Sequence, residues 1–225
     1  MSFILLILIA AIPAYLIGSV NGAIITSKYF YRKDIRKFGS GNAGLTNFFR
    51  VFGKGGVLLV ILIDVLKTAA PVIFGGWLFA RFSDVALAPY WLFNPFFDIA
   101  LFGILLSGLF VELGHCFPLY YGFKGGKGVM AIGIIVIILD WRLALIAWGI
   151  FMLVVLATRY VSLGSIIGTA TFPFFQYFVF DLGGVKEFVL AFLCATLIVA
   201  RHSGNIQKLI KGQESKLSFS RKSKQ

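Results

Sequence analysis

Long apolar stretches alternate along this chain with shorter segments in which glycine and polar residues gather. A stretch of about 20 predominantly apolar residues is long enough to cross the hydrocarbon core of a bilayer as a helix. The pattern therefore predicts an all-α integral membrane protein with about seven transmembrane helices, built as one polytopic domain over residues 1–225. The expected spans are residues 3–27, 55–79, 97–115, 128–140, 143–158, 162–180 and 186–200.

The first apolar stretch begins at Phe3 with no basic segment before it, unlike a cleaved secretory signal. It is also long enough to span a bilayer. We therefore expect it to be retained as the first transmembrane helix.

The composition agrees with a membrane protein. Of the 225 residues, 59% are hydrophobic and 13% are charged, whereas a soluble domain has about half apolar and about a quarter charged residues. This excess excludes an ordinary soluble globular protein and leaves no length for a separate soluble domain. The two cysteines, Cys116 and Cys194, are too few for a disulfide framework and lack the spacing of a metal site.

The lysines and arginines are distributed unevenly between the two predicted membrane faces. With seven spans, one face carries 17 of the 21 lysines and arginines, while the opposite face carries only Arg81, Arg142 and Lys186. Cytoplasmic loops are enriched in lysine and arginine. We therefore expect the N-terminus outside and the C-terminus in the cytoplasm. Part of this charge is explained by topology and by attraction to anionic lipid headgroups.

The first polar segment of the basic face is "DIRKFGSGNAGLTNFFR", residues 34–50. Glycines allow successive backbone N–H groups to point inward as an anion-binding nest, and arginine adds charge with a forked geometry. A flexible glycine-rich turn is the alternative interpretation. The candidate binding residues are Arg36, Gly39, Ser40, Gly41, Asn42, Thr46, Asn47 and Arg50.

The second segment is "GHCFPLYYGFKGGKG", residues 114–128, in which Gly125, Gly126 and Gly128 surround Lys127. Its spacing differs from the Walker pattern. A glycine-lysine loop directly before a helix is still a good phosphate site, because the first N–H groups of the helix are free. His115 is either a ligand or proton carrier, or a packed and hydrogen-bonded histidine.

The third segment is "ARHSGNIQKLIKGQE", residues 200–214, at the end of the last span. His202 and Asn205 are three residues apart and share a helix face beside Arg201. A histidine in this setting can donate to a phosphate or accept a proton from a hydroxyl. An interfacial basic helix end is the alternative.

Several polar side chains also fall within or beside the predicted spans, where ionisable groups are costly and usually paired or functional. Asp64 and Lys67 are three residues apart, so we expect an ion pair that faces the bundle interior. Lys67 is also placed to reach toward the site on the basic face. Ser19, Asn21 and Glu112 are the other members of this group.

The three glycine-rich segments lie far apart in sequence but on one predicted face. Together they would form a pocket rich in backbone N–H groups, arginine and lysine, which suits one or more phosphates. The chain has no clustered acidic residues for magnesium and no Cys/His metal set, so a metal-free group transfer or anion binding is favoured. A transporter of a phosphorylated metabolite and a scaffold for anionic lipid are the alternatives. Transporters usually bind at the bilayer midplane between structural repeats, and no repeat is visible here.

Four motifs together closely resemble the acyl-phosphate:glycerol-3-phosphate acyltransferase family, the PlsY type of bacteria. They are "GSGNAGLTNFFR" (39–50), "GHCFPLYYGFKGGKG" (114–128), "RYVSLGS" (159–165) and "RHSGNIQKLIKGQE" (201–214), and the similarity runs from Ser19 to Glu214. The resemblance implies a seven-helix enzyme of the bacterial inner membrane with its active site facing the cytoplasm. Such enzymes transfer a fatty acyl group from acyl phosphate to the 1-hydroxyl of glycerol 3-phosphate, giving lysophosphatidic acid and phosphate for phospholipid biosynthesis. No cofactor, metal or nucleic acid is expected, and we expect a monomer surrounded by membrane lipid.

The resemblance also implies roles for single residues. Ser40 and either Arg36 or Arg50 would be important for activity, the 125–128 loop would bind glycerol 3-phosphate, and Glu214 would be structural. The predicted catalytic residues are Ser40, Arg36, Lys127, His202 and Asn205. The predicted substrate-binding residues are Gly39, Gly41, Asn42, Thr46, Asn47, Arg50, Gly125, Gly126, Gly128, Arg201, Ser19, Lys67 and His115.

An acyl phosphate is already activated, so the reaction needs no covalent nucleophile on the protein. The site must instead hold two phosphates close together and orient the glycerol hydroxyl. The residues leave open whether His202 or the leaving phosphate accepts the proton. Two departures from the family pattern are Val129-Met130-Ala131 in place of Val-Ala-Thr, and a tail, residues 215–225, that we interpret as a surface-charge feature.

Overall fold

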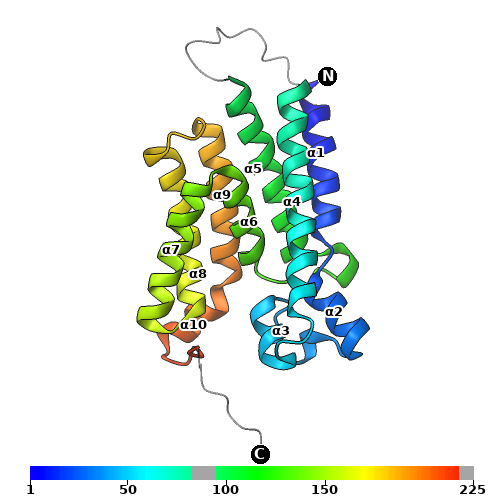
Figure 1. Ribbon diagram of the computed structural model, residues 1–225, viewed down its shortest axis with the longest axis vertical. Coiled ribbons are helices and arrows are strands. Elements are labelled where there is room, and N and C mark those ends of the chain that lie inside the picture. Colours follow the sequence, from blue (N-terminus) through cyan, green and yellow to red (C-terminus); the bar gives the residue numbers. More distant parts are fainter. Residues whose placement is uncertain (83–94, 218–225) are drawn as a thin grey trace, which may run out of the picture.

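The computed structural model describes residues 1–82 and 95–217, and the regular elements within these residues are all helical (Figure 1). Each of the seven predicted stretches is helical, so the predicted all-α class is confirmed. Residues 218–225 of the predicted basic tail lie outside the described residues. The α-helices are α1 (Phe3–Gly18), α2 (Gly22–Tyr31), α3 (Leu45–Phe52), α4 (Val57–Phe82), α5 (Pro95–Cys116), α6 (Val129–Leu139), α7 (Trp141–Thr158), α8 (Val161–Phe174), α9 (Val185–Arg201) and α10 (Ser203–Ile210). The shorter turns are the 3-10 helices η1 (Ile35–Lys37) and η2 (Leu119–Tyr121) and the π-helical turn η3 (Phe175–Val179).

Four helical segments of the described residues are long and apolar enough to cross a membrane: Phe3–Tyr31, Val57–Phe82, Ile99–Tyr121 and Trp141–Thr158. A fifth is added if α9 and α10, which meet at a bend of 56°, count as one span. The remaining apolar helices, α6 and α8, have 11 and 14 residues. The protein is therefore an all-helical membrane protein with four to five candidate spans, and the seven-span arrangement stays a prediction.

The first predicted span, residues 3–27, is wrong as a single helix because the chain breaks at Ser19–Asn21 between α1 and α2. The Asn21 side chain caps α2 by accepting the N–H of Ile24 at 2.9 Å. Gly22 then donates its N–H to Asp64 Oδ1 of α4 at 3.3 Å. These bonds satisfy N–H groups that would otherwise be orphaned at a helix start within the bundle.

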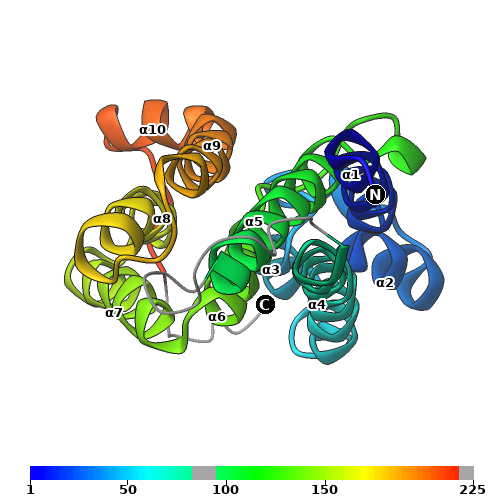
Figure 2. The same cartoon turned by 90° about the horizontal axis from the view of Figure 1, so that it is seen from above.

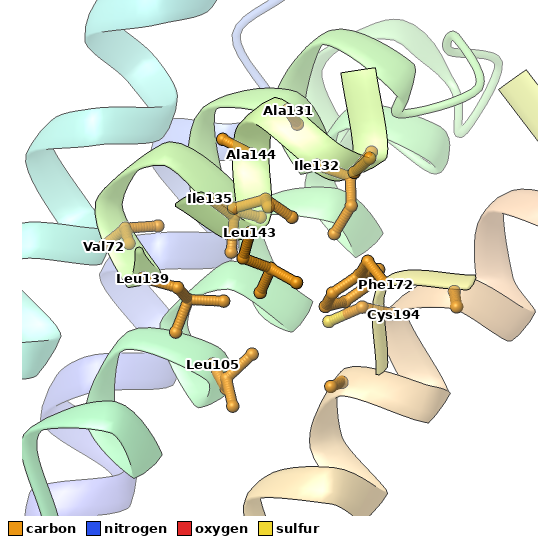
Figure 3. Packing of buried hydrophobic residues seen from close by; sticks show 14 of the residues in the cluster. Val72, Leu105, Ala131, Ile132, Ile135, Leu139, Leu143, Ala144, Phe172 and Cys194 are labelled. Carbon is orange, nitrogen blue, oxygen red and sulfur yellow. The ribbon is translucent and has the colours of Figure 1, made fainter. Parts of the chain in front are cut away.

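The long helices form two groups that meet at α5. Helices α1 and α4 pack on one side of α5, and α6 and α9 pack on the other side, with α7 and α8 beyond them (Figures 1 and 2). The largest cluster of buried apolar side chains lies between α5, α6, α7, α8 and α9 and includes Ile135, Leu143, Phe172 and Cys194 (Figure 3). A second cluster joins Leu6, Phe79 and their neighbours between α1, α4 and α5.

Helix α6 is short and mostly buried. It packs against α4, α5, α7 and α8, and its buried side chains point in several directions, as Ile132, Ile135 and Leu139 show in Figure 3. A helix that is apolar all round is expected to be buried. The loop that precedes α6, residues 123–128, packs against the end of α5, where the Gly126 N–H donates to the His115 carbonyl.

The polar segments gather at one end of the bundle, where α2, α3 and α10 lie (Figure 1). The 34–50 segment, predicted only as a glycine-rich loop, continues into the amphipathic helix α3. Phe48 of α3 is fully buried with Ile35 and Ala43, while Phe49 is exposed. This third apolar cluster fixes the loop 38–44 against α2 and α4.

Candidate active site

A cavity of about 860 Å³ opens at the polar end of the bundle. It brings the three glycine-rich segments of the sequence together, as predicted. Its lining consists of Asp34, Arg36, Lys37, Ser40, Gly41, Asn42, Tyr121, Gly122, Phe123, Lys124, Gly125, Lys127, Arg201, Gly204, Asn205 and Lys208.

The lining is strongly cationic. Six of its side chains are lysine or arginine, and Asp34 is its single acidic residue. Clefts lined by one sign of charge concentrate ligands of the opposite sign. The cavity therefore suits a ligand that carries more than one negative charge, such as one with phosphate groups.

The loop 38–42 is shaped by Asn47, a buried residue of α3. Its side-chain oxygen accepts the N–H of Ser40 at 2.9 Å, and its amide donates to the carbonyls of Phe38 and Asn42 at 3.0 Å each. Gly39 has φ +60° and packs so close that a Cβ would lie 2.3 Å from the Asn47 oxygen. Because the Ser40 N–H already donates to Asn47, Ser40 can contribute its exposed hydroxyl to an anion site but not its backbone N–H.

Arg36 connects this loop to the second glycine-rich segment. Its guanidinium pairs with both oxygens of Asp34, at 3.0 Å from Nε and 2.7 Å from Nη2, and Nη1 donates to the Tyr121 carbonyl at 2.8 Å. The hydrogen bonds from Arg36 hold the pKa of Asp34 at about 2, and the same pair raises the pKa of Arg36. Arg36 thus lines the cavity, while most of its N–H donors are already bonded to Asp34 and Tyr121.

The loop 123–128 runs between α5 and α9. The N–H of Gly126 donates to the His115 carbonyl at 3.1 Å, and the Gly126 carbonyl accepts the Arg201 guanidinium at 3.3 Å. A Cβ on Gly126 would lie 2.2 Å from His115 Nε2, so no larger residue fits. Gly126 therefore fixes the loop, and Gly125 and Lys127 on either side of it face the cavity.

Lys127 reaches across the cavity wall to α10. Its ammonium donates to Asn205 Oδ1 in a short hydrogen bond. Asn205 in turn donates to Glu214 Oε1 at 2.8 Å, and Ser162 of α8 donates to the same oxygen at 2.8 Å. Burial lowers the pKa of Lys127, with the nearby Glu214 acting in the opposite direction. Lys127 is thus a partly desolvated cation held in one place.

His202 lies at the junction of α9 and α10 and is buried. Its Nδ1 lies 2.8 Å from the Ile198 carbonyl, which can only accept, so the hydrogen of the neutral ring is assigned to Nδ1 and Nε2 is left as an acceptor. Burial lowers the pKa of His202, partly offset by the bond to Ile198 and reinforced by Lys127. These features leave the ring neutral at neutral pH, with one nitrogen able to accept a proton.

The predicted site residues fall into four places. Eight line the cavity: Arg36, Ser40, Gly41, Asn42, Gly125, Lys127, Arg201 and Asn205. Gly39, Asn47, Gly126 and Gly128 support these lining segments from behind, and Ser19, Lys67, His115 and His202 are buried beneath them. Thr46 and Arg50 are exposed outside the lining, where Arg50 Nη2 lies 3.4 Å from Ser215 Oγ.

Sequence reasoning missed several lining residues, of which Lys208 is the clearest. It lies three residues after Asn205 on α10, so helical spacing could have placed it on the same face. Lys37, Tyr121 and Phe123 carried no comparable signal, because their position depends on how η1 and η2 fold back over the cavity.

A protein-family model described as glycerol-3-phosphate acyltransferase matches residues 8–212. The chain belongs to the glycerol-3-phosphate acyltransferase family. The resemblance drawn from the four motifs is thereby confirmed. As a family member, the chain is a membrane acyltransferase of phospholipid synthesis whose product is lysophosphatidic acid.

Glycerol-3-phosphate acyltransferases from other organisms are similar over nearly the whole chain. The protein from Chlorobaculum tepidum is 38% identical over 240 aligned residues, covering 94% of this chain and 96% of its own. That from Thermoanaerobacter pseudethanolicus is 36% identical over 209 residues, covering 93% and 94%.

Two solved structures share the fold. Both are crystal structures of PlsY (YgiH), an integral membrane glycerol 3-phosphate acyltransferase. The glycerol 3-phosphate form matches with a TM-score of 0.78 and 32% identity over 94% of this chain and 96% of that one. The lysophosphatidic acid form matches with a TM-score of 0.77 and 30% identity over 94% and 95%. This chain therefore shares its fold with members of the glycerol-3-phosphate acyltransferase family along nearly the full length of the chain.

Proposed function

We propose that this acyltransferase transfers a fatty acyl group from acyl phosphate to the 1-hydroxyl of glycerol 3-phosphate in the cavity described above. The observation that carries the proposal is the convergence of six cations with Ser40 and Asn205 in one cavity at the end of an apolar bundle. Two phosphate-bearing substrates repel each other, and a site with this charge offsets the repulsion. The glycerol 3-phosphate form of the homologous structure supports the same choice of acceptor.

In this proposal Lys127 binds the phosphate of glycerol 3-phosphate, and Arg201, Lys124 and Lys208 supply further positive charge around the two phosphates. The hydroxyl oxygen attacks the acyl carbonyl carbon, the bond from that carbon to the phosphate oxygen breaks, and phosphate leaves with the electron pair. The hydroxyl proton passes to a phosphate oxygen, or through one water molecule to Nε2 of His202, which is buried beneath the lining. Ser40 and Asn205 orient the reacting groups, which is a large part of such catalysis.

The membrane arrangement that we propose has seven spans, with the N-terminus outside and the cavity and C-terminus facing the cytoplasm. The charge bias supports it, since 17 of the 21 lysines and arginines fall on one predicted face. Because both native cysteines are buried, single-cysteine variants can be labelled with a membrane-impermeant maleimide in intact cells. Lys186→Cys should react from outside, and Lys54→Cys should react only after permeabilisation. The reverse pattern would overturn the orientation.

The activity is tested by reconstituting the purified protein in lipid, supplying acyl phosphate and glycerol 3-phosphate, and following release of phosphate and formation of lysophosphatidic acid. We expect release that depends on glycerol 3-phosphate, does not occur with a thioester donor and persists with a metal chelator. Uptake of glycerol 3-phosphate into proteoliposomes with no product from any chain length would instead favour a transporter and reject the enzyme.

A further inference from the structure

Three ionisable side chains form a buried cluster beneath the cavity without lining it. Asp64 and Lys67 of α4 and His115 of α5 are 3%, 4% and 4% exposed. Lys67 uses all three donors of its ammonium. It lies 2.9 Å from Asp64 Oδ1, and it donates to the Val20 carbonyl at 2.7 Å and contacts His115 Nδ1 at 2.7 Å. The ion pair expected from the i, i+3 spacing is therefore present, and it extends to a histidine.

The contact with Lys67 fixes the tautomer of the His115 ring. A lysine ammonium can only donate, so His115 Nδ1 must accept, and the hydrogen of the neutral ring is assigned to Nε2. Nε2 faces the loop 123–128, because a Cβ on Gly126 would lie 2.2 Å from it. Lys67 thereby holds the imidazole in one orientation directly under that loop.

His115 also contacts the loop through its backbone. Its carbonyl accepts the Gly126 N–H at 3.1 Å, and a Cβ on Gly125 would lie 2.0 Å from the same oxygen. The other glycine-rich loop also packs against Gly126, because a Cβ on Gly126 would lie 2.9 Å from the Ala43 carbonyl. The same carbonyl accepts the Asn21 side-chain amide at 3.1 Å. Both substrate-facing loops therefore rest on the His115 region.

We propose that Lys67 and His115 are positioning residues of the acyltransfer site, which act through Gly126 to set the place of Lys127. Neither side chain lines the cavity, so neither is assigned a contact with substrate. The inference rests on the proposed role of the 123–128 loop in binding glycerol 3-phosphate. If the cluster only held helices together, its loss would lower stability and leave the substrate dependence of the folded enzyme unchanged.

The test uses His115→Leu and the double variant Asp64→Asn/Lys67→Met, which removes both charges together so that no buried charge is left unpaired. We expect each to raise the KM for glycerol 3-phosphate by about tenfold or more while the KM for acyl phosphate changes less, because the loop binds the acceptor. The combined variant should raise the KM for glycerol 3-phosphate no more than the more severe of the two variants does, since the effects of residues that act as one unit are not additive. Thr68→Val is the matched control: Thr68 is buried one residue from Lys67, and its hydroxyl donates to the Asp64 carbonyl and not to His115 or the loop 123–128 among the described residues.

Wild-type enzyme is assayed first, so that inactivity of the wild type, which rejects the proposed function, is separated from failure of this inference. If the cluster variants do not fold, His115→Asn decides, because its side-chain oxygen can still accept from Lys67 while the ring contact with Gly126 is lost. Folded cluster variants, or His115→Asn, with a wild-type KM for glycerol 3-phosphate would overturn the proposal. A stability loss matched by Thr68→Val with no change in KM would do the same.

Discussion

The Lys127 ammonium donates to the Asn205 side-chain oxygen, joining a loop and a helix that lie 78 residues apart in sequence. The loop comes from between α5 and α6, and Asn205 comes from α10, so the bond closes one wall of the cavity. Asn205 is held in turn by Glu214. A phosphate that enters the cavity meets a cation that is already placed and partly desolvated, which strengthens its electrostatic interaction.

Replacing Lys127 with Ala should mainly raise the KM for glycerol 3-phosphate, by about 10-fold to 100-fold, the value of a lost charge-assisted hydrogen bond. The kcat should fall less. Initial rates over a range of glycerol 3-phosphate concentrations measure both constants. Lys211→Ala is the control, because Lys211 is an exposed cation outside the cavity. An unchanged dependence on glycerol 3-phosphate would remove Lys127 from the binding site.

The two candidate proton acceptors can be separated by pH. Burial lowers the pKa of His202 below its ordinary value of 6.5, so the ring stays neutral until the pH falls below that value and only then loses its capacity as a base. His202→Gln should lower kcat by about 100-fold or more, and the fall of kcat toward acid should disappear. A substrate phosphate titrates at a pKa of about 6, so a preserved acid limb would identify the phosphate as the base. A wild-type kcat in His202→Gln would make His202 structural.

Glu214 should act through Asn205 and not through substrate. Its Oε1 accepts from both Ser162 and Asn205, so Glu214→Ala leaves two donors without a partner. We expect a lower midpoint of thermal unfolding together with a lower kcat, and a loss of about 1–3 kcal/mol in the free energy of unfolding. Glu214→Gln keeps one acceptor oxygen and should be milder. If both variants behaved alike and only KM changed, Glu214 would be a substrate ligand.

Activity should require the branched guanidinium of Arg36 as well as its positive charge. It pairs with both oxygens of Asp34 and reaches the Tyr121 carbonyl, which a lysine cannot do together. Arg36→Lys should lower kcat/KM by about tenfold, with little change in the unfolding midpoint. Lys37→Arg, on the same turn but without these bonds, is the comparison. Full activity of Arg36→Lys would show that positive charge alone is enough there.

Much of the fold could be predicted because the apolar stretches are long and separated by clear polar segments. The break in the first span could not, because Ser19–Asn21 interrupts the apolar run only briefly and the break depends on Asp64 accepting the N–H of Gly22. Helix α3 could not be predicted either, for a similar reason. The segment is rich in glycine up to Gly44, and the helix that follows is fixed by the burial of Phe48.

The candidate site could be predicted as a collection of residues but not as a geometry. Ser40, Lys127 and Asn205 were recognised from local density of glycine and polar groups, and they line one cavity. Lys67 and His115 were expected to bind substrate, and they are buried beneath the lining instead. Their partners come from helices far apart in sequence, and no local pattern carries that information.

The shortness of helix α6 has a consequence for where the chemistry happens. With 11 residues at 1.5 Å each, α6 is only about 16 Å long, roughly half the thickness of the hydrocarbon core of a bilayer. If its far end lies near the opposite surface, the loop carrying Lys127 is recessed well below the headgroup plane. A water-soluble acceptor would then descend past the headgroups to the level of the lipid tails, and a donor would enter sideways with its chain still dissolved in the bilayer. The length of α6 would thus set the depth in the membrane at which a polar acceptor and an apolar acyl donor meet.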